Sequence, residues 1–242
     1  MNVIVITGAT SGIGYSCVKK FLIKQNIVVG IGRNLQKLKK IKNDFKSQNT
    51  KFIGLKCDFE KKNDMKFLIN KLLKFKKIDT LINCAGLSHK GKIKDIKLKD
   101  WNRLMYVNVT VPYLLTQKLL LKLAKSNTPA VVNVSSIAGR SRSISLGCHY
   151  TTSKAALIGM TRHLAAELAT KKIRVNCCAP SQTLTPMLIK SLSKKGQKKL
   201  IENIPLKRLS SANEQSEVIY FLASEKSSYI NGAIIDVNGG QL

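Results

Sequence analysis

The chain has 242 residues, 44% of them hydrophobic, and carries 42 lysines and arginines against 13 aspartates and glutamates, a formal net charge of +29. This length and composition fit one large globular domain with a full hydrophobic core. No apolar run is long enough to span a bilayer, and the first residues show no signal-peptide pattern, so we expect a cytoplasmic protein with no membrane segment.

The positive charge has two interpretations. It indicates either an anionic partner, such as nucleic acid, a membrane surface or an acidic protein, or compositional drift. Only seven of the 42 cations are arginines, and the lysines are spread over several amphipathic segments. A nucleic-acid site would gather cations in one block with interleaved aromatic residues. The spread makes nucleic acid unlikely as the partner, favours drift, and leaves an acidic partner open.

The six cysteines form no C-x-x-C pair, and several fall within strand-like or motif segments. We therefore expect reduced thiols, with no metal site and no disulfide.

The chain opens with a strand, a glycine-rich turn and a helix. Residues 3–6 are β-branched, residues 7–14 read T-G-A-T-S-G-I-G, and a helical pattern follows. In this setting, backbone N–H groups and a helix N-terminus bind a phosphate. We expect Gly8 to permit the tight turn, Gly12 to let a pyrophosphate approach, and Gly14 to let the helix pack closely on the strand.

The second expected strand, residues 27–32, ends at Gly32 and Arg33. An acidic residue at this place would bind the ribose hydroxyls of NAD, whereas an arginine suits the 2′-phosphate of NADP. We therefore expect NADP rather than NAD. The alternative is that Arg33 is a solvated loop cation.

Strands and helices alternate along the rest of the chain, with no linker or repeat. We expect helices at 35–46, 61–75, 98–125 and 150–169, and strands at 52–55, 78–82, 130–134 and 173–177. This alternation predicts a single α/β domain over residues 1–242, a doubly wound parallel sheet that binds its ligand at the carboxyl ends of the strands. Five polar or turn-forming residues lie at such ends: Thr7, Asp58, Asn83, Ser136 and Pro180.

Tyr150 and Lys154 lie one helical turn apart on one face. An ammonium beside a phenol favours the phenolate and lowers the pKa of the tyrosine. Moving that pKa by ~3 units takes ~4 kcal/mol. A serine hydroxyl nearby would hold a substrate oxygen while Tyr150 supplies its proton. Alone, this spacing is also common on solvated helix faces.

Together, these motifs resemble the short-chain dehydrogenase/reductase family over nearly the whole chain. The matching residues are Thr7-Gly8-x-x-x-Gly12-x-Gly14, Asn83-x-Ala85-Gly86, Asn108, Ser136, Tyr150-x-x-x-Lys154, Pro180 and the closing segment 237–240. The resemblance implies a Rossmann-like sheet of about seven strands with helices on both faces, a nicotinamide cofactor and a homotetramer.

The resemblance also implies four catalytic roles. Tyr150 is the expected acid/base, Lys154 holds the nicotinamide ribose and lowers the Tyr150 pKa, Ser136 hydrogen-bonds the carbonyl, and Asn108 positions a water. Ser136 is preferred over Ser135 because Ile-Ala-Gly follows it.

For the cofactor, the resemblance implies that Asp58 and Phe59 flank the adenine. The full expected cofactor set is Gly8, Ser11, Gly12, Ile13, Gly14, Arg33, Asp58, Phe59, Asn83, Ala85, Gly86, Tyr150, Lys154, Pro180 and Thr183.

Substrate identity depends on segments 87–94, 140–149 and 183–209, the last expected to form a helical lid. Residues 204–208, I-P-L-K-R, resemble a phrase frequent in 3-oxoacyl-carrier-protein reductases. A 3-oxoacyl thioester is the leading substrate, with a sugar, polyol or other small alcohol or ketone as the alternative. A non-catalytic NADP-binding regulator or basic scaffold is the alternative of another class, although the complete catalytic set argues against it.

Two further groups of residues have expected roles near the substrate. Arg140, Arg142, Lys171 and Lys172 are candidates for docking an acidic carrier protein. His89 and His149 are either substrate contacts or ordinary polar loop residues.

Overall fold

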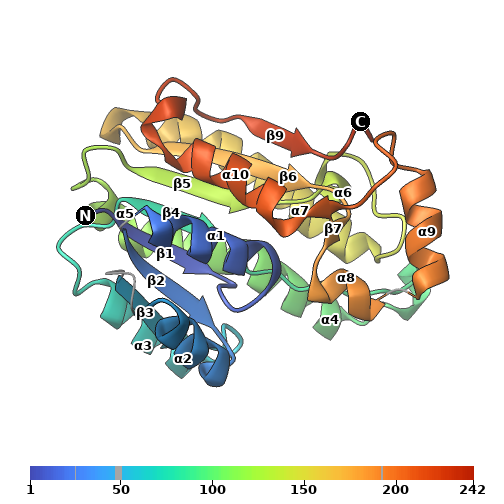
Figure 1. The fold of residues 1–242 in the computed structure, drawn as a ribbon, viewed down its shortest axis with the longest axis horizontal. Coiled ribbons are helices and arrows are strands. Elements are labelled where there is room, and N and C mark those ends of the chain that lie inside the picture. Colours follow the sequence, from blue (N-terminus) through green and yellow to red (C-terminus); the bar gives the residue numbers. More distant parts are fainter. Residues whose placement is uncertain (25, 47–50, 192) are drawn as a thin grey trace.

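The computed structural model describes residues 1–24, 26–46, 51–191 and 193–242. Seven parallel strands form one sheet in the order β3-β2-β1-β4-β5-β6-β9 (Figure 1). The strands are β1 (Val3–Thr7), β2 (Ile27–Gly32), β3 (Lys51–Lys56), β4 (Thr80–Asn83), β5 (Ala130–Val134), β6 (Arg174–Pro180) and β9 (Ile234–Val237). Both β1 and β5 are buried at every position, which is typical of parallel strands covered on both faces.

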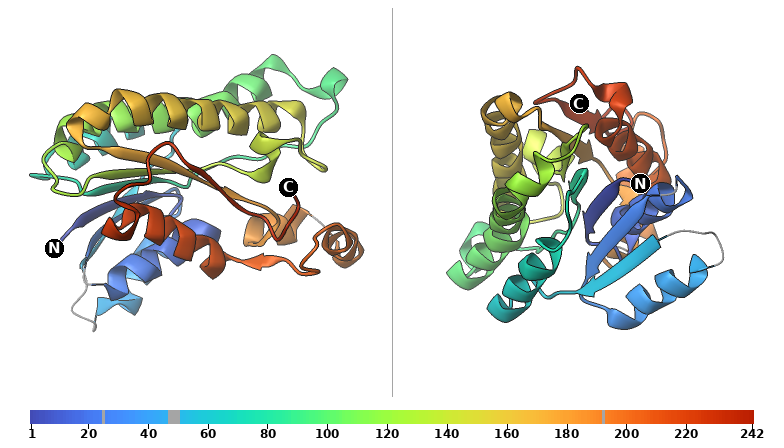
Figure 2. Two further views of the ribbon diagram at one scale, coloured as in Figure 1. Left: turned by 90° about the horizontal axis from the view of Figure 1, so that it is seen from above. Right: turned by 90° about the vertical axis from the view of Figure 1, so that its left-hand side faces the viewer.

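Helices cover both faces of the sheet (Figure 2). One face carries α1 (Gly12–Ile23), α2 (Leu35–Asp44) and α10 (Ala212–Ala223), and the other carries α3 (Lys62–Leu72), α5 (Val111–Leu123) and α7 (Cys148–Glu167). Each helix layer forms its own hydrophobic core with the sheet. The predicted doubly wound, seven-stranded single domain is confirmed.

The strand order reverses between β1 and β4, and a crevice opens there. The Thr7 hydroxyl accepts hydrogen bonds from the backbone N–H groups of Cys84 and Ala85, both at 3.0 Å. Gly8 has φ +70°, and a Cβ there would lie 3.0 Å from the backbone of Ala85. The absence of a side chain at this turn therefore lets the ends of β1 and β4 approach closely, at the point where doubly wound sheets bind ligands.

The long helix expected over 98–125 is divided. It consists of α4 (Leu98–Met105), a π-helical turn (Tyr106–Thr110) and α5. Pro112 has no N–H to donate to the carbonyl of Asn108, so the α-helical hydrogen-bond ladder is interrupted there. The extra residue of the π turn accommodates this interruption and leaves Asn108 buried beside the crevice.

A second, small sheet lies beyond the carboxyl ends of the main strands. β7 (Thr183–Leu184) pairs in parallel with β8 (Ser210–Ser211), and the Ser210 hydroxyl donates to that of Thr183 over 3.0 Å. The intervening segment contains α8 (Pro186–Ser191) and α9 (Lys194–Glu202), and residue 192 of it lies outside the described residues (Figure 1). Ile204 anchors the segment because it is only 2% exposed.

Within the described ranges, no helix is long and apolar enough to cross a membrane.

Candidate active site

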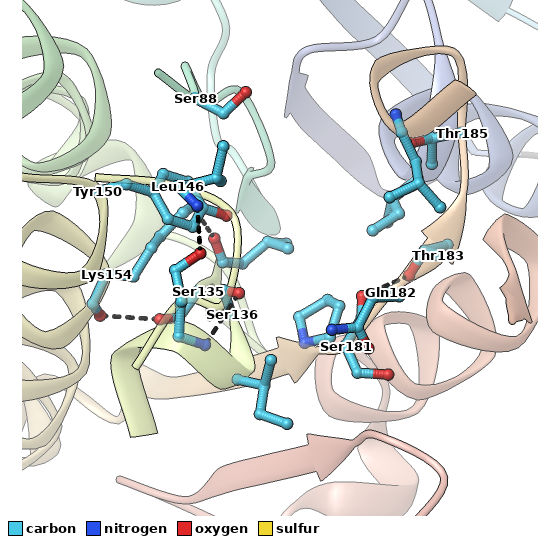
Figure 3. A pocket seen from close by; sticks show the side chains of 18 of the residues that line it. Ser88, Ser135, Ser136, Leu146, Tyr150, Lys154, Ser181, Gln182, Thr183 and Thr185 are labelled. Atoms are coloured by element: carbon cyan, nitrogen blue, oxygen red, sulfur yellow. Dashed lines mark hydrogen bonds between the residues drawn. The ribbon is translucent and has the colours of Figure 1, made fainter. Parts of the chain in front are cut away.

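The crevice contains a cavity of about 680 Å³. Its walls come from the glycine-rich turn, the carboxyl ends of β4, β5 and β6, the start of α7 and the segment between β7 and β8. Figure 3 shows Ser135, Ser136, Tyr150 and Lys154 on one side, with Gln182, Thr183 and Thr185 facing them. Residues far apart in the sequence thus form one continuous lining.

The glycine-rich turn has the shape of a phosphate site. A Cβ on Gly14 would lie 2.3 Å from the carbonyl oxygen of Gly8, so α1 packs directly on the turn. Gly12 has φ +54°, and its Cβ would lie 3.1 Å from Cγ2 of Thr185. Ser11 precedes α1, and its side chain makes no capping hydrogen bond within the described chain. The N–H groups of the first helical turn are therefore available to an anion.

The structure distinguishes the two adjacent serines after β5. Ser135 is buried and donates its hydroxyl hydrogen to the carbonyl of Lys154 over 2.8 Å. Ser136 lines the cavity, accepts a hydrogen bond from the N–H of Ala138 at 3.1 Å, and hydrogen-bonds the phenol of Tyr150. Ser136 is therefore the serine placed to act with Tyr150, whereas Ser135 holds α7 against the sheet.

A close backbone contact explains this placement. Ser136 begins the short helix α6 (Ile137–Arg140), and a Cβ on Gly139 would lie 2.6 Å from the carbonyl carbon of Lys154. Only glycine allows α6 to pack this closely on α7, which brings Ser136 to Tyr150.

Lys154 does not have the expected effect on Tyr150. Its ammonium donates to the carbonyl of Val134 over 2.8 Å and lies 5.9 Å from the centroid of the Tyr150 ring. Burial raises the pKa of Tyr150, and the hydrogen bond from Ser136 only partly opposes this. Burial also lowers the pKa of Lys154. The prediction of a lowered Tyr150 pKa is wrong for this arrangement, and Tyr150 is a protonated phenol at neutral pH.

Asn108 organises the loop after β4. Its amide oxygen accepts from the N–H of Leu87 at 2.8 Å, and its amide nitrogen donates to the carbonyl of Leu87 and the hydroxyl of Ser153, both at 3.0 Å. A Cβ on Gly86 would lie 3.5 Å from both the Asn108 oxygen and the Lys154 nitrogen. Three of the expected catalytic residues, Ser136, Tyr150 and Lys154, thus line the cavity, and Asn108 lies buried beside them.

Most of the expected cofactor residues line the cavity. Besides Tyr150 and Lys154, these are Gly8, Ser11, Gly12, Ile13, Gly14, Ala85, Gly86, Pro180 and Thr183.

Four expected cofactor residues lie outside this lining. Arg33 is exposed beyond the end of β2, and the carboxylate of Asp58 accepts from the N–H of Glu60 at 3.3 Å. The ring of Phe59 packs in the hydrophobic core, so it is not available to stack on an adenine. Asn83 is buried beneath the crevice and donates to the side chain of Asn133 over 2.8 Å.

Several loop residues line the cavity besides the expected site residues. Ser88, Thr185 and the run 141–146 lie in the segments expected to determine the substrate, whereas Cys84 and Gln182 were not expected at the site. Loop residues follow no hydrophobic period, so only their nearness to the Ser136 and Tyr150 motifs was a signal. Burial raises the pKa of the Cys84 thiol to about 12, which makes it a poor nucleophile.

Comparison with known proteins relates this arrangement to one family. The sequence profile of short chain dehydrogenases matches residues 2–196. The chain is 33% identical to the 3-oxoacyl-[acyl-carrier-protein] reductase FabG of Aquifex aeolicus (strain VF5) over 241 residues, which cover 99% of this chain and 96% of that protein. It is 31% identical to dehydrogenase/reductase SDR family member 6 of Rattus norvegicus, covering 99% and 96%.

Solved structures show the same relationship. A 3-oxoacyl-[acyl-carrier protein] reductase from Brucella melitensis ATCC 23457 superimposes with a TM-score of 0.92 at 29% identity, covering 100% of this chain and 91% of that one. Levodione reductase superimposes with a TM-score of 0.91 at 24% identity, covering 99% and 97%, which shows the shared fold.

Proposed function

Because the chain belongs to the short-chain dehydrogenase/reductase family, we propose that it is an NADP(H)-dependent, cytoplasmic oxidoreductase that transfers a hydride between nicotinamide and a carbonyl or secondary alcohol. One observation carries this proposal. A protonated Tyr150, hydrogen-bonded to Ser136, opens into the same cavity as the phosphate-shaped glycine turn.

The cofactor supplies the hydride, and the residues of the chain bind the reactants and move the proton. The N–H groups at the start of α1 would hold the diphosphate, and Lys154 would hold the nicotinamide ribose. Ser136 donates a hydrogen bond to the substrate carbonyl, and Tyr150 transfers its phenolic proton to the same oxygen as the alcohol forms. The raised pKa of Tyr150 keeps that proton in place at neutral pH.

The preference for NADP rests on Arg33. Its guanidinium is exposed next to Gly32, where a Cβ would already lie 2.7 Å from Cγ2 of Thr10. The nearby carboxylate of Glu60 is held by Arg103 through contacts of 2.6 and 3.0 Å. Arg33 is thus free of a strong ion pair in the described structure and suits a 2′-phosphate.

A 3-oxoacyl thioester is the proposed substrate. The FabG relatives are named as reductases of such carrier-linked substrates. The substrate end of the cavity includes Leu87, Ile144, Leu146 and Leu188, which suit an acyl chain. The hydroxyls of Ser88, Ser141 and Ser145 in the same lining favour a sugar, polyol or other small polar ketone as the second candidate. We infer that residues 183–209 form the lid over this end.

A cofactor-oxidation assay tests this function. NADPH is supplied with a panel containing 3-oxoacyl thioesters, keto-sugars and small ketones, and its oxidation is followed spectrophotometrically. We expect turnover with NADPH and highest kcat/KM for a 3-oxoacyl thioester. Tight binding of NADPH without turnover of any carbonyl would identify a non-catalytic regulator instead.

We further propose a homotetramer that forms through α7. Four apolar residues lie at helical spacing here: Leu157, Met160, Leu164 and Leu168. Leu157 and Leu168 are 1% and 3% exposed and pack in the core, so these two are not contact residues. The exposed face of α7 carries Ala155, Gly159 and Ala166, and a Cβ on Gly159 would meet nothing within 4 Å. These small residues leave room for a second copy of the helix, which would also meet the exposed side chain of Arg162 on this face.

A further inference from the structure

Two histidines connect the loops on either side of the catalytic tyrosine. Nδ1 of His89 lies 3.2 Å from Nε2 of His149, and their rings are perpendicular with centroids 5.3 Å apart. His89 follows the lining residue Ser88, and His149 immediately precedes Tyr150. A contact between these two side chains therefore fixes the loop after β4 relative to the start of α7.

The surroundings leave His149 little freedom to move. It is fully buried, and a Cβ on Gly147 would lie 2.6 Å from its Cε1. The N–H of Gly147 donates to the carbonyl of His89 over 3.0 Å, which adds a backbone link between the same two loops. The second ring nitrogen of His149, Nδ1, has no side-chain hydrogen-bond partner among the described residues.

Protonation determines whether the hydrogen bond between His89 and His149 can form. One hydrogen bond between two imidazoles needs one donor and one acceptor, so the pair is held while at least one facing nitrogen is unprotonated. Two imidazolium rings would present two donors and two positive charges to each other.

The neighbours of His149 determine how readily it is protonated. Burial lowers the pKa of His149, and the charge of His89 lowers it further, while the backbone of Gly147 and the carboxylate of Asp100 on α4 raise it. Burial is the largest of these effects, so the surroundings of His149 disfavour its protonation.

We propose that the hydrogen bond between His89 and His149 positions Tyr150 against Ser136, and that double protonation of the pair releases Tyr150 and slows the reaction in acid. This inference rests on the proposed function for its kinetic readout. His89 and His149 are positioning residues, since neither lines the cavity in the described structure.

The pH profile of kcat for carbonyl reduction, from pH ~5 to ~8, tests this inference. In the wild type, kcat falls on the acidic side. His89→Gln retains a hydrogen-bonding side chain that does not titrate, so its acidic limb should be flatter. His89→Phe keeps a ring without the bond and should lose roughly tenfold in kcat at every pH, a part of the ~10²–10⁴ that a positioned proton donor contributes. KM for NADPH should not change.

The third histidine supplies the control. His163 is exposed on α7 beside Glu167, and His163→Gln should leave the profile unchanged. Identical acidic limbs in the wild type and His89→Gln would overturn the proposal.

Histidine nitrogen NMR on the free protein supplies a test without substrate. The ring-nitrogen signals of His89 and His149 should change together as the pH is lowered. Independent titration of the two would also refute the pair, whether or not the protein reduces a carbonyl.

Discussion

At Tyr150, we expect the hydroxyl group to be needed for catalysis and not for cofactor binding. Tyr150→Phe keeps the ring in the cavity but removes the proton and the hydrogen bond to Ser136. We expect unchanged NADPH affinity and a loss of ~10²–10⁴ in kcat. Tyr113→Phe, at an exposed tyrosine of α5 bonded to Gln117, is the matched control and should be silent. Near-normal turnover by Tyr150→Phe would refute the mechanism.

At Arg33, we expect one guanidinium to determine the choice between NADP and NAD. A charge-assisted contact with a phosphate is worth ~1.5–3 kcal/mol, so Arg33→Ala should reduce the preference for NADPH over NADH by about ten- to a hundredfold. Lys40→Ala, an exposed cation on α2, should leave the preference unchanged. The ratio of kcat/KM for the two cofactors measures this, and a wild type that favours NADH would contradict it.

For single residues, the sequence predicted positions along an element better than the directions of the side chains. The Tyr150-x-x-x-Lys154 spacing predicted that both side chains lie on one helix face, because residues four apart in a helix are neighbours. The direction of the Lys154 ammonium was not predictable, since it depends on the carbonyl of Val134, twenty residues earlier and on another element. The same limit applies to Phe59, whose position at a strand end suggested a ligand contact although its ring packs in the core.

Among the elements, α10 is held at its C-terminal end by hydrogen bonds from a side chain of the sheet. Arg174, at the start of β6, donates to the carbonyls of Leu222 and Ser224 at 2.9 and 3.1 Å and to the hydroxyl of Ser227 at 2.9 Å. These groups surround the C-terminal end of the helix, where a cation is favourable. The planar, five-donor guanidinium satisfies all three acceptors, which a lysine does not.

Arg174→Lys should therefore lower the free energy of unfolding by ~1–3 kcal/mol, because buried acceptors lose their donor. Urea denaturation measures the change. Arg142→Lys, at an exposed arginine of the loop after α6, is the control and should change stability little. Equal stability of the two variants would show that the contacts of Arg174 add nothing.

Element boundaries differ in how well local sequence predicts them. Short β-branched runs and the glycine turn located the main strands, since burial and turn chemistry act over a few residues. The π-helical turn at Tyr106–Thr110 was missed because the helical hydrophobic pattern continues through it. Pro112 was the available signal. The order of strands in the sheet was not predicted, because pairing between distant strands leaves no local pattern.

For the whole molecule, the charge of +29 still needs a functional account. The expected docking cations are not equivalent, since Arg140 forms an ion pair with Asp236 at 3.1 Å. Arg142 is exposed and lines the cavity, and Lys171 lies in the turn Ala169–Lys171 after α7. Arg142 and Lys171 are thus the better candidates for meeting an acidic carrier.

Reversing Arg142 and Lys171 to Glu should lower kcat/KM for a carrier-bound substrate, and added salt should reduce the difference. A small uncharged thioester should be reduced at an unchanged rate. Lys74→Glu with Lys76→Glu, two exposed cations after α3, is the control for net charge. Equal effects on both substrates would instead support compositional drift.

Assembly is the other property at this scale. Gly159→Glu places a charge on the exposed face of α7, where the free subunit has room for a side chain. We expect the proposed tetramer to dissociate while the subunit remains folded. Light scattering with circular dichroism measures both, and Lys42→Glu on α2 is the control. A wild type that is monomeric at micromolar concentration would contradict the proposed assembly.

The pairing of β7 with β8 has a consequence for how substrate preference changes. The proposed lid leaves and re-enters the domain through two adjacent two-residue strands, so its ends stay together whatever its length. Doubling the length of a closed loop costs only about 0.6 kcal/mol, little compared with the stability of a domain. The segment between the two strands can therefore be replaced with little loss of stability. A lid grafted from a relative between Leu184 and Ser210 would bring a new substrate pocket to an unaltered proton-transfer site.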